Sequence, residues 1–271
     1  MHHYETLQTS LEDSVLTITM HRPEKRNALN PAMMQELTHA FLSAGDDRGC
    51  GAVILTGAGS AFCAGLDLDH LQSLSAKTRE EHRADTELIA RMLRTLYDLP
   101  KPTIAAVNGG AVAGGMGLAT ICDFTLSVPE AKFGYTEVRI GFIPAIVSAY
   151  LRSQIGDKRS RDLLLTGRQV KAVEALDLGL VTRIVCEADL MAEAQRLAQC
   201  LLRNSPAAIQ ATKRLMNDYA SHELDQQLAL AVAANVEARS TEDFKEGVRS
   251  FLEKRAPEWP SLRVEKTVAS R

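Results

Sequence analysis

The sequence lacks several features that would assign a protein to a class at once. Its 31 basic and 34 acidic residues nearly cancel, which leaves a formal net charge of −3. Bulk electrostatics therefore give no reason to expect a nucleic acid or an anionic membrane surface as a partner. Glycines and charges interrupt the apolar stretches well before the roughly 18 residues that a membrane-spanning helix needs. The polar N-terminus also lacks the apolar core of a signal peptide.

Cysteines are few and show no pairing pattern. The five in the chain are scattered, their number is odd, and none form C-x-x-C. This usage predicts a reduced, cytoplasmic protein. His, Cys, Asp and Glu residues do not cluster at the spacing typical of metal ligands, so we expect no metal.

Familiar glycine motifs are missing as well. The chain has no G-x-x-x-x-G-K-[ST] and no G-x-S-x-G, and its second glycine-rich loop lacks G-x-G-x-x-G in the proper place after a strand. These absences remove the sequence support for a P-loop, a serine hydrolase or a dinucleotide-binding protein.

What the chain does contain is a long alternation of strand and helix patterns. Its 271 residues, 45% of them hydrophobic, are enough to bury a sizeable core. Short apolar strands that alternate with helices predict an α/β fold with a mostly parallel sheet covered by helices. After about Pro144 the pattern is nearly all helical. The expected strands are 15–20, 52–56, 103–107, 124–128 and 181–185, and the expected helices are 31–44, 79–99, 145–155, 158–166, 171–178, 188–203, 206–219, 222–239 and 241–254.

Two glycine-rich segments, 57–67 and 108–117, each follow a predicted buried strand. Glycine after a parallel strand lets backbone N–H groups approach a ligand, and a helix that starts there favours negative charge. Two such exits side by side could direct two N–H donors at one carbonyl oxygen, which would be an oxyanion hole. Glycines that merely permit tight turns explain the same segments about equally well.

Six blocks in order resemble the enoyl-CoA hydratase/isomerase (crotonase) superfamily over about residues 5–260. They read HRPEKRNALN, SAFCAGLDL, IAAVNGGAVAGGMGLATICD, AKFGYTEVRIGFIP, LLLTGRQVKAVEALDLGLV and FLEKR. The resemblance implies a spiral of ββα units over residues 1–200 and a helical C-terminal trimerisation region over 201–271. It further implies an acyl-CoA substrate, coenzyme A being part of that substrate with no separate cofactor, and a homotrimer or homohexamer.

The resemblance also implies roles for single residues. The backbone N–H groups of Leu66 and Gly114 would form the oxyanion hole, and Glu137 would be the catalytic acid/base. Coenzyme A would be bound by residues near the first loop and in the C-terminal helix, the latter often from a neighbouring subunit: Lys25, Ala28, Ala64, Asp67, Leu68, Phe251 and Lys254.

The acid/base positions leave the reaction open. Hydratases of the standard type carry one glutamate in a G-G-x-E-L-A pattern, whereas this chain has Gly117 there; the second glutamate, in an F-G-x-x-E block, is present as Glu137. Hydration needs one group for water and one for the α-carbon, while moving a proton between C2 and C4 needs a single base. Against an isomerase, EVRIGFIPAIVS resembles a bacterial branch that also has Gly here and is associated with methylglutaconyl-CoA hydration.

We therefore expect an enoyl-CoA hydratase-type lyase of fatty acid metabolism, with a Δ3,Δ2-enoyl-CoA isomerase and a non-catalytic acyl-CoA binder as alternatives. A helix that begins near Gly114 would place position 117 about one turn in, facing the thioester. Two further residues are less clear. His70 follows the first loop, where a histidine is typically solvent-facing, and Arg139 could pair with a carboxylate on the substrate.

Overall fold

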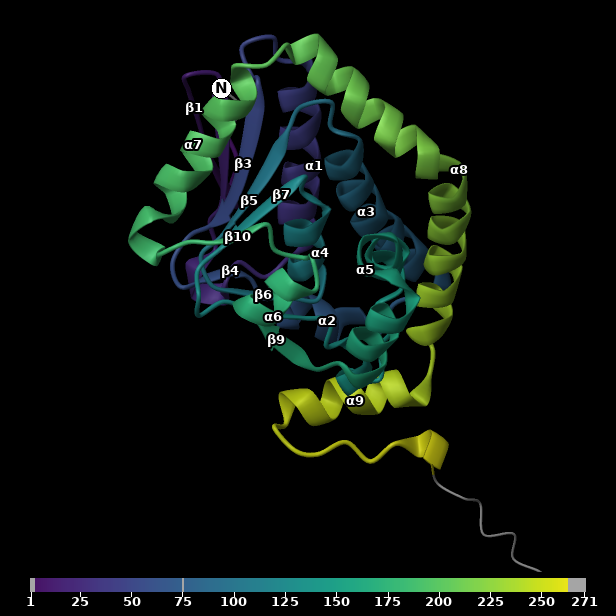
Figure 1. Cartoon of the computed structure of the whole chain (residues 1–271). Helices are drawn as coiled ribbons and strands as arrows, with labels where there is room; N and C mark the ends of the chain where they lie inside the picture. The colour runs from purple at the N-terminus through teal and green to yellow at the C-terminus, as the bar shows by residue number, and fades with distance from the viewer. Residues whose placement is uncertain (1–2, 75, 263–271) are drawn as a thin grey trace, which may run out of the picture.

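The computed structural model describes residues 3–74 and 76–262. Its larger sheet lies at the centre of the molecule (Figure 1) and has the strand order β1-β2-β3-β5-β7-β10. The strands are β1 Leu7–Glu12, β2 Val15–Met20, β3 Ala52–Gly57, β5 Thr103–Val107, β7 Phe124–Ser127 and β10 Arg183–Ile184. From β2 to β10 all neighbours run parallel, so the predicted sheet type is confirmed.

The first strand was not predicted from the sequence. β1 pairs antiparallel with β2 through a two-residue turn in which Asp13 and Ser14 both have positive φ, 48° and 62°. Two central residues of this kind make the tight hairpin whose twist matches that of its strands. The polar segment LQTSLE has only two apolar residues, and the Asp-Ser pair was the signal that could have identified it.

A second, smaller sheet contains the order β4-β6-β8-β9, with β4 Ala61–Cys63, β6 Gly110–Val112, β8 Lys132–Gly134 and β9 Gln169–Lys171. Each of its strands has only three residues, too few for an alternating pattern to be seen. Segments 57–67 and 108–117, taken as loops from the sequence, therefore each contain a strand. Pairs such as β3–β4 and β5–β6 divide between the two sheets before a helix follows, which confirms the expected ββα spiral.

Helices cover the sheets and fill most of the second half of the chain (Figure 1). The α-helices are α1 Pro31–Asp46, α2 Leu68–Leu74, α3 Arg79–Asp98, α4 Gly114–Ile121, α5 Ala145–Thr166, α6 Ala172–Asp177, α7 Leu190–Leu202, α8 Pro206–Ala238 and α9 Glu242–Leu252. Short 3-10 helices are η1 Pro23–Lys25, η2 Glu137–Ile140, η3 Glu187–Asp189 and η4 Pro260–Leu262.

Local sequence explains most helix boundaries. Asn30 caps α1 by accepting from the N–H of Met33, with Pro31 at the first position, as predicted. Gly156, at φ 77° and ψ 165°, interrupts α5 and accounts for the two helices expected there. The prediction of two helices at 206–219 and 222–239 was wrong, because α8 is continuous. Its Tyr-Ala-Ser-His junction contains neither glycine nor proline to end a helix.

The C-terminal helices pack onto the rest of the chain. α8 arches over α3 and α5, and α9 lies below them against η2 (Figure 1). The contact with η2 is close: a Cβ added to Gly247 of α9 would lie 2.2 Å from the carbonyl carbon of Ile140, and one added to Gly141 would lie 2.2 Å from the carbonyl oxygen of Asp243. The C-terminal region therefore holds the turn that carries Glu137.

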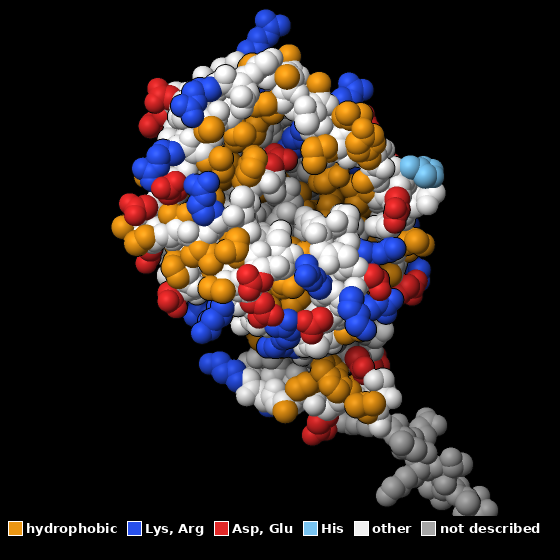
Figure 2. Space-filling model, in the orientation of Figure 1, with side chains coloured by type: hydrophobic (Ala, Val, Ile, Leu, Met, Phe, Trp, Pro, Cys, Tyr) orange, Lys and Arg blue, Asp and Glu red, His pale blue; other side chains and the backbone are white. Residues whose placement is uncertain are grey.

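Basic and acidic side chains are interspersed on the face shown in Figure 2, which is hollowed near its middle with hydrophobic side chains at the rim. Within the described residues, no helix is both long and apolar enough to cross a membrane.

Candidate active site

The two glycine-rich loops lie side by side. β4 and β6 are parallel neighbours, so their C-terminal ends meet at one edge of the small sheet. A Cβ added to Gly65 would lie 3.0 Å from the Cβ of Ala113, and one added to Gly115 would lie 2.3 Å from the carbonyl oxygen of Cys63. Any larger residue at position 115 would therefore push the loops apart. Glycine is required here for close approach as well as for turning.

Leu66 and Gly114 follow the ends of β4 and β6, and each comes directly after a residue with positive φ. Gly65, with φ 88°, precedes Leu66, and Ala113, with φ 51°, precedes Gly114 at the start of α4. Positive φ in a non-glycine residue such as Ala113 is strained, and such strain collects at functional sites. Within the described part of the chain, neither the Leu66 N–H nor the Gly114 N–H donates a hydrogen bond. Both donors are thus available to a ligand oxygen.

Glu137 begins η2 and lines the same pocket as Leu66 and Gly114. Its side chain is buried, with the residue 9% exposed, and its Oε2 has no hydrogen-bond partner among the described residues. Burial raises the pKa of this carboxyl from 4.5 to about 7. A carboxyl that titrates near neutral pH can both accept and return a proton, as a general acid/base must.

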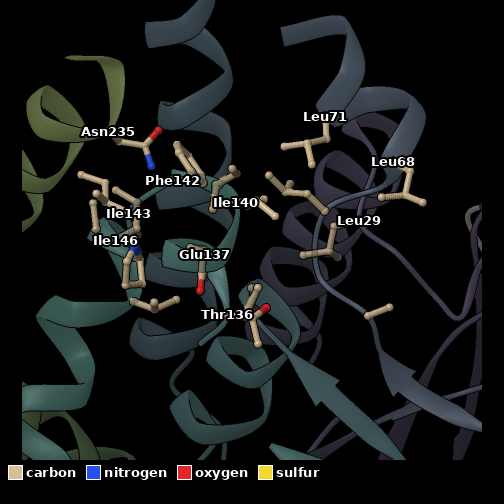
Figure 3. A pocket seen from close by; sticks show the side chains of 18 of the residues that line it. Leu29, Leu68, Leu71, Thr136, Glu137, Ile140, Phe142, Ile143, Ile146 and Asn235 are labelled. Carbon is tan, nitrogen blue, oxygen red and sulfur yellow. The ribbon is translucent and has the colours of Figure 1, made fainter. Parts of the chain in front are cut away.

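The pocket is a mostly apolar cavity of about 150 Å³. Glu137 lies at its middle, with Ile143 and Ile146 on one side and Leu29, Leu68 and Leu71 on the other (Figure 3). Among the described residues that line it, Glu137 supplies the only carboxylate, and Thr136 and Asn235 are the other polar side chains. The arrangement suits a short apolar chain whose carbonyl reaches the two loops.

The residues assigned to coenzyme A divide into two groups. Ala64, Leu68 and Phe251 line the pocket, Phe251 coming from α9 of the same chain. Four others lie outside the lining: Lys25, Ala28, Asp67 and Lys254. Lys25 is exposed and pairs with Asp69 at 2.9 Å, and Lys254 is exposed just after α9.

Ala28 and Asp67 contact the chain itself. Ala28 is buried, and its carbonyl oxygen accepts from Arg22 at 2.7 Å. Asp67 is buried and pairs with Arg22 at 2.8 Å, and its Oδ1 accepts from the N–H of Asp69 at the start of α2. Arg22 thus joins the Ala28 backbone to the Asp67 side chain at the end of the first loop.

The expectation that position 117 faces the thioester needs correction. Gly117 is buried inside α4 and is not part of the pocket lining. A Cβ there would lie 2.7 Å from Cγ1 of Val147, which does line the pocket. The side chain of Val147 therefore occupies the space into which a glutamate at position 117 would extend.

A buried polar cluster next to the pocket was missed from the sequence. Asp85 of α3 accepts from Arg239 at 2.6 Å, its other oxygen lies 2.6 Å from Nε2 of His70, and Lys77 lies 3.8 Å away. Burial alone would raise the pKa of Asp85, but the contact with His70 and the charge and hydrogen bond of Arg239 outweigh it and lower this pKa to about 2. The members lie on four separate segments, so only folding reveals the cluster.

Two residues singled out in the sequence are placed differently from expectation. His70 is buried in this cluster, so the expectation of a solvent-facing histidine was wrong, because α2 turns it inward against α3. Arg139 is exposed, and its side chain lies against Gly167 instead of lining the pocket.

Fold and site together define an α/β protein in which two strand-end loops and one buried acid surround an apolar pocket. The chain matches the model of the enoyl-CoA hydratase/isomerase family over residues 10–262. It therefore belongs to that family, the crotonase superfamily.

Individual relatives agree with this membership. A Thermus thermophilus protein named provisionally as an enoyl-CoA hydratase is 44% identical over 243 residues, which cover 90% of this chain and 96% of the relative. The short-chain-enoyl-CoA hydratase of Clostridium acetobutylicum is 35% identical over 246 residues, covering 90% and 93%. The crystal structure of an enoyl-CoA hydratase/isomerase from Xanthobacter autotrophicus Py2 has a TM-score of 0.86 at 31% identity, covering 93% and 98%.

Proposed function

We propose that this protein is an enoyl-CoA hydratase, which adds water reversibly across the C2–C3 double bond of a 2-enoyl-CoA thioester. The observation that supports this best is Glu137, a buried carboxyl with a pKa of about 7 whose Oε2 has no partner among the described residues, in the apolar pocket that Leu66 and Gly114 also line. Relatives over nearly the full chain carry hydratase names.

The thioester oxygen would accept from the N–H groups of Leu66 and Gly114. As the oxygen of water bonds to C3, the Glu137 carboxylate takes a proton from that water, and the electron pair of the double bond moves to the thioester oxygen as an enolate. Glu137 then returns the proton to C2 and is a carboxylate again. The backbone donors stabilise the charge that develops on oxygen.

A Δ3,Δ2-enoyl-CoA isomerase is the second candidate, favoured by one observation. Glu137 is the only carboxylate among the described lining residues, and Val147 fills the space next to Gly117. In that reaction the same carboxylate removes a proton from C2 and delivers it to C4, so no water has to be held.

Absorbance at the enoyl-thioester band separates these reactions. A hydratase removes the band of crotonyl-CoA, whereas an isomerase creates the band from 3-hexenoyl-CoA. A protein that only binds acyl-CoA changes neither. Loss of the crotonyl-CoA band at a rate proportional to protein concentration is the result expected; an unchanged band would refute the hydratase.

We also infer that coenzyme A lies along the first loop near Lys25, with Lys254 and Phe251 at the C-terminal side. We further infer that the protein assembles as a homotrimer or homohexamer. Its proposed compartment is the cytoplasm and its proposed role is in fatty acid metabolism. Exposed apolar side chains on α8, among them Met216, Tyr219 and Leu230, support assembly. Light scattering at micromolar concentration should give three or six chains; a monomer would contradict this part.

A further inference from the structure

Asn235 of α8 brings a polar group to the pocket wall at a place where the hydratase reaction does not require one. The residue is 4% exposed and lines the pocket together with Phe142 and Ile89. Figure 3 shows its amide at the edge of the cavity, away from Thr136 and beyond Glu137. The neighbouring lining is apolar.

Arg239 fixes which way this amide points. The Nε of Arg239 donates to Oδ1 of Asn235 at 2.9 Å. A guanidinium has donors and no acceptor, so the atom facing it has to be the amide oxygen. The hydroxyl of Thr86 lies 2.9 Å from the same oxygen. The NH₂ group is therefore turned toward the cavity (Figure 3), and no residue that the structure describes accepts from it.

Positive charge lies directly behind this amide. The side chain of Arg239 is fully buried, and its guanidinium stands 5.5 Å from the ring of Phe142, which lines the pocket. Its Nη2 has no hydrogen-bond partner in the described structure. Asp85 pairs with Arg239 at 2.6 Å and lies 3.8 Å from Lys77. Glu81 also interacts with Lys77, so the charge that acts on the amide is that of the Arg239 guanidinium, which donates to it directly.

The NH₂ group reaches the cavity, where water can accept from it, and a chain end that displaced this water without replacing the bond would leave the donor unpaired at a cost in free energy. An acceptor oxygen on the substrate would remove that cost, and an apolar chain end would not. The positive charge of Arg239 polarises the amide further toward donating.

We propose that Asn235 is a specificity-determining residue, whose NH₂ group receives an acceptor oxygen carried at the distal end of the acyl chain. This rests on the proposed hydratase function. The oxygen can belong to a neutral carbonyl or to a carboxylate, and the Arg239 guanidinium bonded to the amide favours the carboxylate.

Three 2-enoyl-CoA thioesters of matched shape test the proposal: 5-methylhex-2-enoyl-CoA with an apolar end, 5-oxohex-2-enoyl-CoA with a neutral acceptor, and 4-carboxybut-2-enoyl-CoA with a charged one. The wild-type kcat/KM should be at least about 10-fold higher for the acceptor-ended substrates than for the apolar one. A higher kcat/KM for the carboxylate-ended substrate than for the ketone-ended one would identify a carboxylate as the group that Asn235 receives.

Two substitutions separate specificity from folding. Asn235→Leu should bring the ratio of acceptor-ended to apolar kcat/KM to one or below. Asn235→Asp, which replaces the donor by an acceptor, should lower kcat/KM for the carboxylate substrate more than for the ketone. A merely structural defect would lower kcat/KM for all substrates by the same factor and leave the ratio of acceptor-ended to apolar kcat/KM unchanged. Asn217→Leu is the matched control on α8, because the Asn217 amide donates to the Tyr97 carbonyl away from the pocket.

The outcomes are distinct. If the wild type hydrates crotonyl-CoA and prefers the apolar-ended substrate, or if Asn235→Leu leaves the ratio unchanged, the inference is wrong and the hydratase function stands. If the wild type turns over none of the four thioesters, both fail.

Discussion

Two buried acids near one pocket, Glu137 and Asp85, are in opposite electrostatic states. Among the described residues Glu137 forms no ion pair, and burial raises its pKa to about 7. Asp85 is also buried, but Arg239 donates to it and His70 lies 2.6 Å away, and its pKa falls to about 2. Burial by itself therefore does not define a catalytic acid. The partner groups decide whether a carboxyl exchanges protons near neutral pH or stays ionised and holds elements together.

Glu137→Gln should remove the proton-exchanging member of the pair. We expect turnover of crotonyl-CoA to fall by about 10²–10⁴, the usual range for a general acid/base. Substrate binding should change little, because the amide has the same shape. Steady-state kinetics, with binding of a saturated acyl-CoA measured by calorimetry, checks both; near-native turnover would remove Glu137 from the mechanism.

Asp85→Asn should break the structural member of the pair. It leaves the buried charge of Arg239 without its counter-ion, which we expect to cost about 3–5 kcal/mol of unfolding free energy. Urea titration measures this. The matched control is Asp157→Asn, which removes an exposed pair with Arg161 and should leave the transition nearly unchanged. Equal effects of the two substitutions would mean that the Asp85 cluster does not support the fold.

The pH dependence of stability should also separate the two acids. The folded-state pKa of Glu137 is above its unfolded value of 4.5, so its contribution is fully present below pH 4.5 and is lost as pH rises through about 7. Above that pH the charged, buried carboxylate destabilises the fold by at most about 3 kcal/mol. Glu137→Gln should therefore raise the melting temperature at pH 8 and leave it nearly unchanged at pH 5. The same melting temperature change at both values would contradict the raised pKa.

The contribution of Asp85 to stability changes with pH in the opposite direction. Its folded-state pKa is below the usual 3.8, so its stabilisation is present above pH 3.8 and is lost as pH falls through about 2. Between pH 8 and pH 4 the melting temperature should therefore show no change that depends on Asp85, and below about pH 3.8 the wild type should lose stability that the Asp85→Asn variant does not lose.

Gly117→Glu would introduce a third acid and should have the smallest effect. Because a Cβ there would lie 2.7 Å from Val147, we expect overpacking to cost about 1–3 kcal/mol and hydration not to increase. Adding Val147→Ala should recover part of the stability. Thermal melts and crotonyl-CoA kinetics of both variants test this; faster hydration by Gly117→Glu alone would show that the side chain reaches the pocket.

The sequence predicted the parts of this molecule that depend on local patterns. Long apolar runs such as Thr103–Val107 and capped helices such as Pro31–Asp46 were found with their order, because burial and capping are encoded within a few residues. The three-residue strands of the small sheet were missed, because their pairing is set by distant segments.

The site also divides into residues found from local motifs and residues brought together only by the fold. The motif match led to Glu137, Leu66 and Gly114, which line one pocket in the structure. Asn235 and Asp85 are 150 residues apart in sequence and belong to no local motif, so their contact through Arg239 had to come from the fold.

Infrared titration of the Glu137 carboxyl tests the central claim most directly. The difference spectrum between wild type and Glu137→Gln isolates the carbonyl stretch of the protonated acid. The account predicts that this band is present at pH 5 and disappears with a midpoint near pH 7. A midpoint near 4.5, the ordinary value for a glutamate, would show that burial leaves this acid unperturbed and would contradict its role as the acid/base.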